Sequence, residues 1–150
     1  MDAFLRKIAI FLIGGLAYFG LEIIYRGYSH WTMFLTGGAA LLCLFTLFTA
    51  CIPLPFWARC IAGGLIVTAI EFVVGIIVNK WLNWNVWDYS SLPFNLFGQV
   101  SLSFSLIWLM LCVPIGFLCR LVHQSISNKP LINFIYFLKS KESSHKKIHP

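Results

Sequence analysis

The chain has 150 residues, of which 59% are hydrophobic and only 11% are charged, and its mean hydropathy is +0.84. Soluble domains are nearer half apolar and a quarter charged, so this composition excludes a soluble globular domain and predicts an integral membrane protein. Because one membrane span takes about 20 residues, the length allows about four spans and leaves no room for a separate soluble catalytic domain.

Four apolar stretches are long enough to cross a membrane, so we expect an all-α polytopic fold with four transmembrane helices. The connections between consecutive stretches are short, which makes neighbouring helices antiparallel. The second connection, Pro53–Arg59, begins with a proline that cannot continue a helix, and Pro114 can bend the last span. The expected spans cover residues 8–25, 31–52, 61–79 and 95–121 of a single bundle over residues 1–122.

Lysine and arginine are distributed unequally over the two sides of this arrangement. One side holds only Arg26 and Lys80, whereas the side with both termini holds Arg6, Lys7, Arg59, Arg120 and the five lysines of the tail. Positive residues concentrate in the cytoplasm, so both termini are expected there. The net charge of +6 is then a topology signal that also attracts anionic membrane lipid, rather than a nucleic-acid surface.

The first apolar run can be compared with a signal peptide because two basic residues precede it. The run continues through Glu22 to Arg26 without a small-x-small cleavage site, and its small residues suit close helix packing. We therefore expect the first helix to be retained.

A similar pattern occurs in the first and third spans. Gly14-Gly15-Leu16 precedes Glu22, and Gly63-Gly64-Leu65 precedes Glu71 at the same offset, 49 positions further on. One interpretation is a duplicated helical hairpin, whose two parallel halves are related by an axis along the membrane normal. Chance is the other interpretation, because glycine and leucine are common in membrane helices.

Polar residues at intervals of three or four positions share one helix face, and several such sets occur in the expected spans. They predict a polar seam near the outer half of the bundle, which is a candidate substrate or proton path. Its members are Glu22 in the first span, with Arg26 and His30 on the same stripe if that helix extends so far, Thr68, Glu71 and Asn79 in the third, and Asn95, Gln99 and Ser103 in the fourth.

The two glutamates are the strongest functional candidates, because a charge at bilayer depth usually faces a partner, a wet cavity or a transport path. Glu22 has a structural alternative, an ion pair with Arg26 or protonated His30 that orders the helix end. Glu71 has no cation four residues away, although Arg26 of the other half could reach it. Glu71 either binds a proton or substrate, or is a protonated carboxyl that holds helices together. The polar residues of the fourth span are read first as interhelical hydrogen bonders.

The connection before the fourth span carries the densest run of distinctive residues. Its tryptophans and Tyr89 fit the aromatic belt of a membrane interface, and Asp88 is typical of a turn or helix cap. A lid-like loop that re-enters the bundle over the polar seam is the alternative. The loop motif consists of Trp87, Asp88, Tyr89, Ser90, Pro93, Asn95 and Gly98.

Other kinds of site have little support in the sequence. The five cysteines form no paired short spacing of the zinc or redox kind, and three of the four histidines lie in the tail. There is no nucleotide-binding loop and no Ser/His/Asp arrangement at a recognisable spacing. We expect no metal, no cofactor and no enzymatic activity.

Residues 123–150 form a basic tail, in which residues 130–139 are rich in leucine, isoleucine and phenylalanine. This segment is predicted to lie on the cytoplasmic leaflet as a short interfacial helix.

The chain resembles the putative type IV ABC-transporter permease family of small bacterial membrane proteins over most of residues 8–121. The resemblance rests on Trp87-Asp88-Tyr89-Ser90, Pro93-Phe94-Asn95, Gly98-Gln99, Ser105 and Trp108, with support from Glu22, Arg26, His30-Trp31, Met33 and Gly37-Gly38.

The resemblance implies a permease component of the bacterial inner membrane that works with a separate ATPase subunit. We expect a homo-oligomer or a complex with other membrane subunits around a polar path that contains Glu71 and Glu22. The connection Pro53–Arg59 is the internal candidate for contact with an ATPase. The alternative is a non-transporting membrane adaptor or regulator whose tail binds a partner or lipid.

Overall fold

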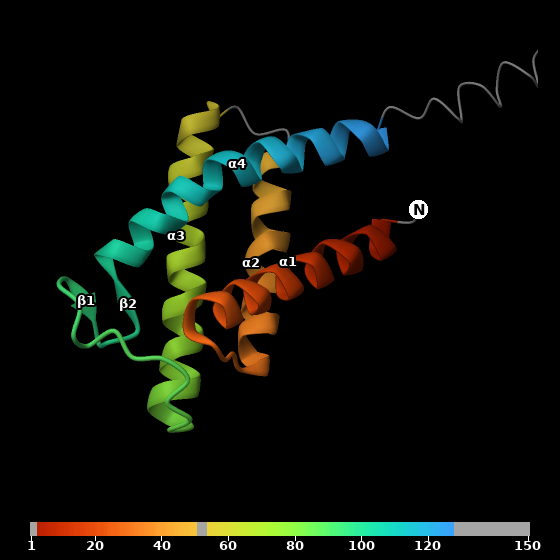
Figure 1. Ribbon diagram of the computed structural model, residues 1–150. Helices are drawn as coiled ribbons and strands as arrows, with labels where there is room; N and C mark the ends of the chain where they lie inside the picture. Colours follow the sequence, from red (N-terminus) through yellow and green to blue (C-terminus); the bar gives the residue numbers. More distant parts are fainter. Residues whose placement is uncertain (1–2, 51–53, 128–150) are drawn as a thin grey trace, which may run out of the picture.

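The computed structural model describes residues 3–50 and 54–127, and within these residues the fold is helical apart from one small hairpin (Figure 1). Four helices are long and apolar enough to cross a membrane, which confirms the expected all-α class. The elements are α1 (Ala3–Arg26), α2 (Trp31–Thr49), α3 (Phe56–Gly75), the π-helical turn η1 (Ile76–Trp81), β1 (Asn95–Leu96), β2 (Val100–Ser101) and α4 (Leu102–Ser127).

The start of the fourth helix differs from the prediction. Asn95 was expected inside a helix, but residues 95–101 form β1, β2 and the turn between them, and α4 begins at Leu102. Phe94, Phe97 and Gly98 have φ of 52°, 53° and 70°, a left-handed conformation that cannot continue a right-handed helix. The prediction that Asn95 shares a helical face with the polar residues that follow it is therefore wrong.

The other boundaries shift by a few residues. α1 begins earlier than expected, at Ala3, and α3 begins at Phe56, directly after Pro55 at its N-cap. α4 continues past Pro114 as one helix. Pro53 and the predicted interfacial helix at residues 130–139 lie outside the described residues.

In Figure 1, α2 and α3 run upright beside each other, and α1 and α4 cross them obliquely. α1 packs on α2 through glycines, because a Cβ atom built at Gly14 would lie 2.6 Å from the carbonyl oxygen of Gly37. α3 packs on α4 in the same way, since a Cβ atom at Gly64 would lie 3.0 Å from the backbone of Leu109. Small residues that let two backbones approach are typical of helix contacts in membranes.

The glycine pairs of both half-patterns thus contact the next helix along the chain. Gly14 and Gly15 face α2, and Gly64 faces α4, whereas Gly63 lies between Leu44 of α2 and Cys112 of α4. This placement agrees with a duplicated hairpin, which stays an interpretation.

The core falls into two parts. The larger part joins α1–α4 around Leu44, Phe48 and Cys112, and the smaller part lies where the loop after η1 meets Met33 of α2. The connection between α2 and α3 is held by the buried guanidinium of Arg59, whose Nη1 donates to carbonyls at the end of α2.

Candidate functional site

Glu71 of α3 is 1% exposed and lies at the centre of a set of aromatic hydrogen-bond donors. Trp108 Nε1 of α4 donates to Glu71 Oε2 over 3.0 Å. The hydroxyl groups of Tyr18 in α1 and Tyr89 in the loop each donate to Oε1 over 3.5 Å. Three elements that are remote in sequence therefore meet at one carboxyl group.

The rings of these donors are held by stacking. Tyr18 stacks on Trp108 with their centroids 5.4 Å apart, and Tyr89 stacks on Phe104 at 4.5 Å. Burial, together with the negative charge of Glu71, raises the pKa of Tyr89 above its ordinary value. The phenol therefore keeps its proton and remains available as a donor.

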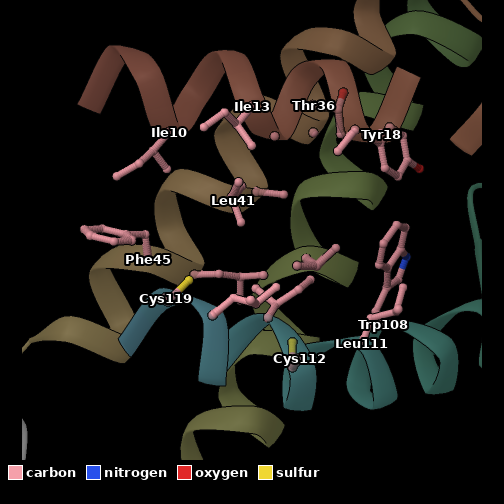
Figure 2. A pocket seen from close by; sticks show the side chains of 18 of the residues that line it. Ile10, Ile13, Tyr18, Thr36, Leu41, Phe45, Trp108, Leu111, Cys112 and Cys119 are labelled. Carbon is pink, nitrogen blue, oxygen red and sulfur yellow. The ribbon is translucent and has the colours of Figure 1, made fainter. Parts of the chain in front are cut away.

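A cavity of about 510 Å³ lies beside this carboxyl, between α1 and α4. Figure 2 shows Tyr18 and Trp108 facing each other at one end of the cavity, and Ile10, Phe45 and Cys119 at the opposite end. Glu71 is the only aspartate, glutamate, lysine, arginine or histidine among the residues that line it. The cavity wall is thus apolar along its length, and the Glu71 carboxyl, which is 1% exposed, lies just behind that wall at the Tyr18–Trp108 end.

A second polar cluster lies on α1, one to two helical turns after Tyr18. Arg26 Nη2 forms an ion pair with Glu22 Oε2 at 2.5 Å, and its Nη1 donates to the carbonyl of Val86 over 3.1 Å. Ser29 Oγ also lies 3.5 Å from Glu22 Oε2. The structural alternative for Glu22 is therefore present, and Arg26 pairs with Glu22 rather than with Glu71.

The loop after η1 folds back into the bundle, where two buried amides hold it. Asn79 Nδ2 donates to Gln99 Oε1 over 2.8 Å, and Asn79 Oδ1 accepts the backbone N–H of Val86 over 2.7 Å. Trp87 Nε1 donates to the carbonyl of Gln99 over 2.9 Å. These bonds fix the segment that delivers Tyr89 to Glu71.

Gly75 makes this approach possible. It lies one helical turn beyond Glu71, where a Cβ atom would meet Gln99 Oε1 at 2.7 Å and Trp87 Cζ2 at 3.0 Å. Trp87 is 4% exposed and packs inwards, which agrees with the prediction of a loop that re-enters the bundle. Trp81 and Trp84 are exposed, which agrees with an aromatic belt at the membrane interface.

The rest of the loop motif stabilises the loop itself. Asp88 Oδ1 accepts the N–H and hydroxyl of Ser90, and these bonds hold the pKa of Asp88 below its usual range. Asn95 Nδ2 donates to the carbonyl of Leu92 over 2.8 Å, and its Oδ1 accepts the N–H of Gly98 over 3.0 Å. Pro93 is exposed in the same loop.

Three residues of the predicted seam stay apart from Glu71. His30 is the N-cap of α2, where its side chain accepts from the N–H of Thr32, and its ring packs against Trp31 and Trp84. Thr68 is half-buried on α3 and Ser103 is exposed at the start of α4, and neither side chain has a hydrogen bond within the described part of the chain.

The sequence interpretation did not place Tyr18 and Trp108 in the site. Tyr18 lies four residues before Glu22 and so extends the same helix stripe, which was an available signal. Trp108 was noted only as part of the family resemblance. An indole N–H in an apolar surrounding needs a hydrogen-bond acceptor, so Trp108 inside an apolar span indicates that an acceptor lies nearby.

The chain was also compared with known proteins. It matches no curated protein and no solved structure. The family described as Putative ABC-transporter type IV matches residues 9–141, which include α2, α3, α4 as far as the structure describes it, most of α1, the loop and Glu71. This multi-pass membrane protein therefore belongs to the Putative ABC-transporter type IV family.

Proposed function

We propose that this protein is the permease component of an ABC transporter in the bacterial inner membrane, and that Glu71 is its substrate-binding carboxyl. The observation that carries the proposal is the position of Glu71. The carboxyl is buried inside a membrane-spanning helix, accepts hydrogen bonds from three aromatic side chains, and borders a cavity between helices. An ionisable group at this depth is costly, and in transporters such groups mark the substrate or ion path.

The loop adds support because it supplies one of the three donors to Glu71, so the site depends on a connection as well as on helices. Tyr89 reaches Glu71 from a segment that is held by Asn79 and Gln99 at the outer end of α3. Opening of this loop would remove one donor from the carboxyl and expose the site to the outer side. Loop movement of this kind is a common way to gate access to a site.

The proposed orientation has both termini in the cytoplasm. Arg26 and Lys80 lie at the ends of α1 and η1 next to the loop, whereas Arg6, Lys7, Arg59 and Arg120 lie toward the opposite ends of their helices. The positive-inside rule then places the loop outside and the connection between α2 and α3 inside. That connection, with the cytoplasmic helix ends, is the proposed contact surface for an ATPase.

ATP hydrolysis is assigned to a separate subunit, because the sequence contains no glycine-rich phosphate loop of the G-x-x-x-x-G-K-[ST] kind. The chain itself is proposed to have no catalytic activity. Four spans give a small permease unit, so the proposal includes a second copy or other membrane subunits that complete the path.

The first test is the composition of the complex. The protein is tagged at its native expression level, extracted gently and analysed by native mass spectrometry. The proposal predicts an ATPase subunit in stoichiometric amount. A homo-oligomer that carries no ATPase contradicts the proposal and favours the adaptor alternative, in which the polar groups only hold the bundle together.

The second test is Glu71→Gln in the purified complex reconstituted in nanodiscs. Glutamine can still accept the Trp108 N–H, so the folded amount should stay close to wild type. Transport-coupled ATP turnover should fall about tenfold, the loss of about 1.4 kcal/mol of interaction. Glu22→Gln, the matched carboxyl of the first half, should keep most of the turnover. Wild-type turnover in Glu71→Gln would remove Glu71 from the mechanism.

A further inference from the structure

We infer that the cavity between α1 and α4 binds an amphiphilic organic cation, whose positive head lies at Glu71 and whose hydrocarbon tail lies along the apolar part. This inference rests on the proposed function, because it names the substrate class of the same site. It follows from the shape of the cavity, its single charge and the aromatic rings at its acidic end.

The cavity is elongated. Its lining on α1 runs from Ile10 to Leu21, and its lining on α4 runs from Trp108 to Val122. At 1.5 Å per residue these segments are about 16 Å and about 21 Å long. The volume of about 510 Å³ lies within the range of small-molecule sites. A long apolar space with one polar end fits a linear tail with a compact head.

The charge of the site selects the head. Glu71 lies beyond ion-pair distance of every lysine, arginine and histidine in the described residues, and Arg26 is engaged by Glu22 and the Val86 carbonyl. A carboxylate offers about four acceptor positions, and three donors are already directed at this one. In a low-dielectric surrounding an unpaired charge is strongly unfavourable, so the carboxyl either takes up a proton, which is the helix-holding alternative, or pairs with a positive charge. A bound cation supplies that charge, whereas an anion is repelled.

The aromatic rings favour an organic cation over a hydrated metal ion. Tyr18 and Trp108 border the same end of the cavity and stack on each other there, as Figure 2 shows. Aromatic rings attract an ammonium group that lies within about 6 Å of their centroids. They also tolerate the apolar carbons attached to the nitrogen, which a strongly hydrated ion does not have.

The test measures binding of alkyltrimethylammonium salts to the full chain in nanodiscs, by equilibrium dialysis with radiolabelled decyltrimethylammonium. Empty nanodiscs give the partition background. Competition by decyl sulfate and by decyl glucoside, which carry the same tail with an anionic and a neutral head, measures selectivity for the head. We expect one saturable site per chain, and at least tenfold weaker competition by both other amphiphiles.

Two further measurements assign the two ends of the site. Glu71→Gln should weaken binding at least tenfold, and Glu22→Gln should leave it unchanged. Binding from water should rise about fourfold for each methylene in empty nanodiscs and in the site alike, because lipid tails are as apolar as the cavity. The tail end is assigned by the tail length beyond which saturable binding above the nanodisc background stops rising. The comparison of heads and tails uses the wild-type protein alone, so it stands even if a variant does not fold.

The outcomes separate this inference from the proposed function. Equal binding of cationic and neutral amphiphiles, or the lack of a saturable site, overturns the cation site even where Glu71→Gln still impairs ATP turnover. The cavity would then be left to a neutral lipid tail or to a second copy of the chain. Selective, Glu71-dependent binding supports the cation site even where no ATPase is found, which would contradict only the permease assignment.

Discussion

Glu22 and Glu71 lie at equivalent places in the two halves of the chain, eight residues after a Gly-Gly-Leu sequence begins, yet their surroundings differ. Four residues after Glu22 comes Arg26, which forms an ion pair with it. Four residues after Glu71 comes Gly75, which offers no charge but lets the loop pack against the helix. The first carboxylate is neutralised by its own helix, whereas the second depends on donors from other elements and has no cation beside it among residues 3–50 and 54–127.

The same Gly-Gly-Leu and glutamate spacing thus occurs at an ion-paired carboxylate and at one held by aromatic donors. The two differ in the residue one helical turn later, which is Arg26 in one case and Gly75 in the other. A cation at that position makes the carboxylate a structural anchor, which here ties α1 to the loop through the Val86 carbonyl. A glycine at that position leaves the carboxylate available and brings a second segment close to it. Four experiments test this distinction, and they are taken from the largest expected effect to the smallest.

Gly75→Leu should have the largest effect, because its side chain would occupy the space of Gln99 and Trp87. Overpacking alone costs about 1–3 kcal/mol and sometimes more. Displacement of Gln99 and Trp87 also breaks the hydrogen bonds that hold the loop, so the total exceeds the cost of losing the Asn79 bonds alone. We expect a clear drop in thermal stability in nanodiscs and faster proteolysis of the loop. Gly20→Leu is the matched control, since no atom lies within 4 Å of a Cβ atom at Gly20. Equal stability of the two variants would contradict the role assigned to Gly75.

Asn79→Ala should cost about 2–6 kcal/mol. It leaves the Val86 N–H and Gln99 Oε1 each without its Asn79 partner, at about 1–3 kcal/mol for each buried polar group. The hydrogen-exchange rate of the Val86 amide should rise, whereas the rates of the helical amides should change less. Ser91→Ala in the exposed part of the same loop should change stability by less than about 0.5 kcal/mol. Unchanged protection of Val86 would show that Asn79 does not hold the loop.

Glu22→Gln and Arg26→Gln, singly and together, measure the ion pair of the first half. The pair is partly exposed, so a double-mutant cycle on unfolding free energy should give a coupling of about 1 kcal/mol. Arg26→Gln should cost more than Glu22→Gln, because it also removes the bond to the Val86 carbonyl. A coupling near zero would mean that the helix end is ordered without the ion pair.

Asp88→Asn should have the smallest effect and act on pH dependence alone. Hydrogen bonds from Ser90 lower the pKa of Asp88, so its contribution to loop stability is complete above about pH 4 and is lost as pH falls through the lowered pKa. Hydrogen-exchange protection of the loop, corrected for the intrinsic rate, should decline below that pH in wild type. The decline should be smaller in Asp88→Asn, and an identical decline would assign it to another group.

Part of the polar site was predictable because helical spacing is local. Glu22 and Arg26 share a face at an interval of four in any α-helix, and Asn79 lies two turns beyond Glu71 on the same face. Gln99 was predicted as a polar contact, but on a helix that begins only at Leu102. The error arose because Phe94 and Phe97 adopt positive φ, which a sequence signals clearly only when the residue is glycine.

The sequence by itself determined the four apolar spans, the unequal distribution of lysine and arginine, and the two helices that carry a carboxylate. Only the tertiary structure decided that Tyr18, Tyr89 and Trp108 meet at Glu71, since they lie 53, 18 and 37 positions from it along the chain. The physical reason is that lipid tails are as apolar as a protein interior. Every face of such a helix is apolar, so the inward face, and with it the cavity, follows from helix crossing and loop packing.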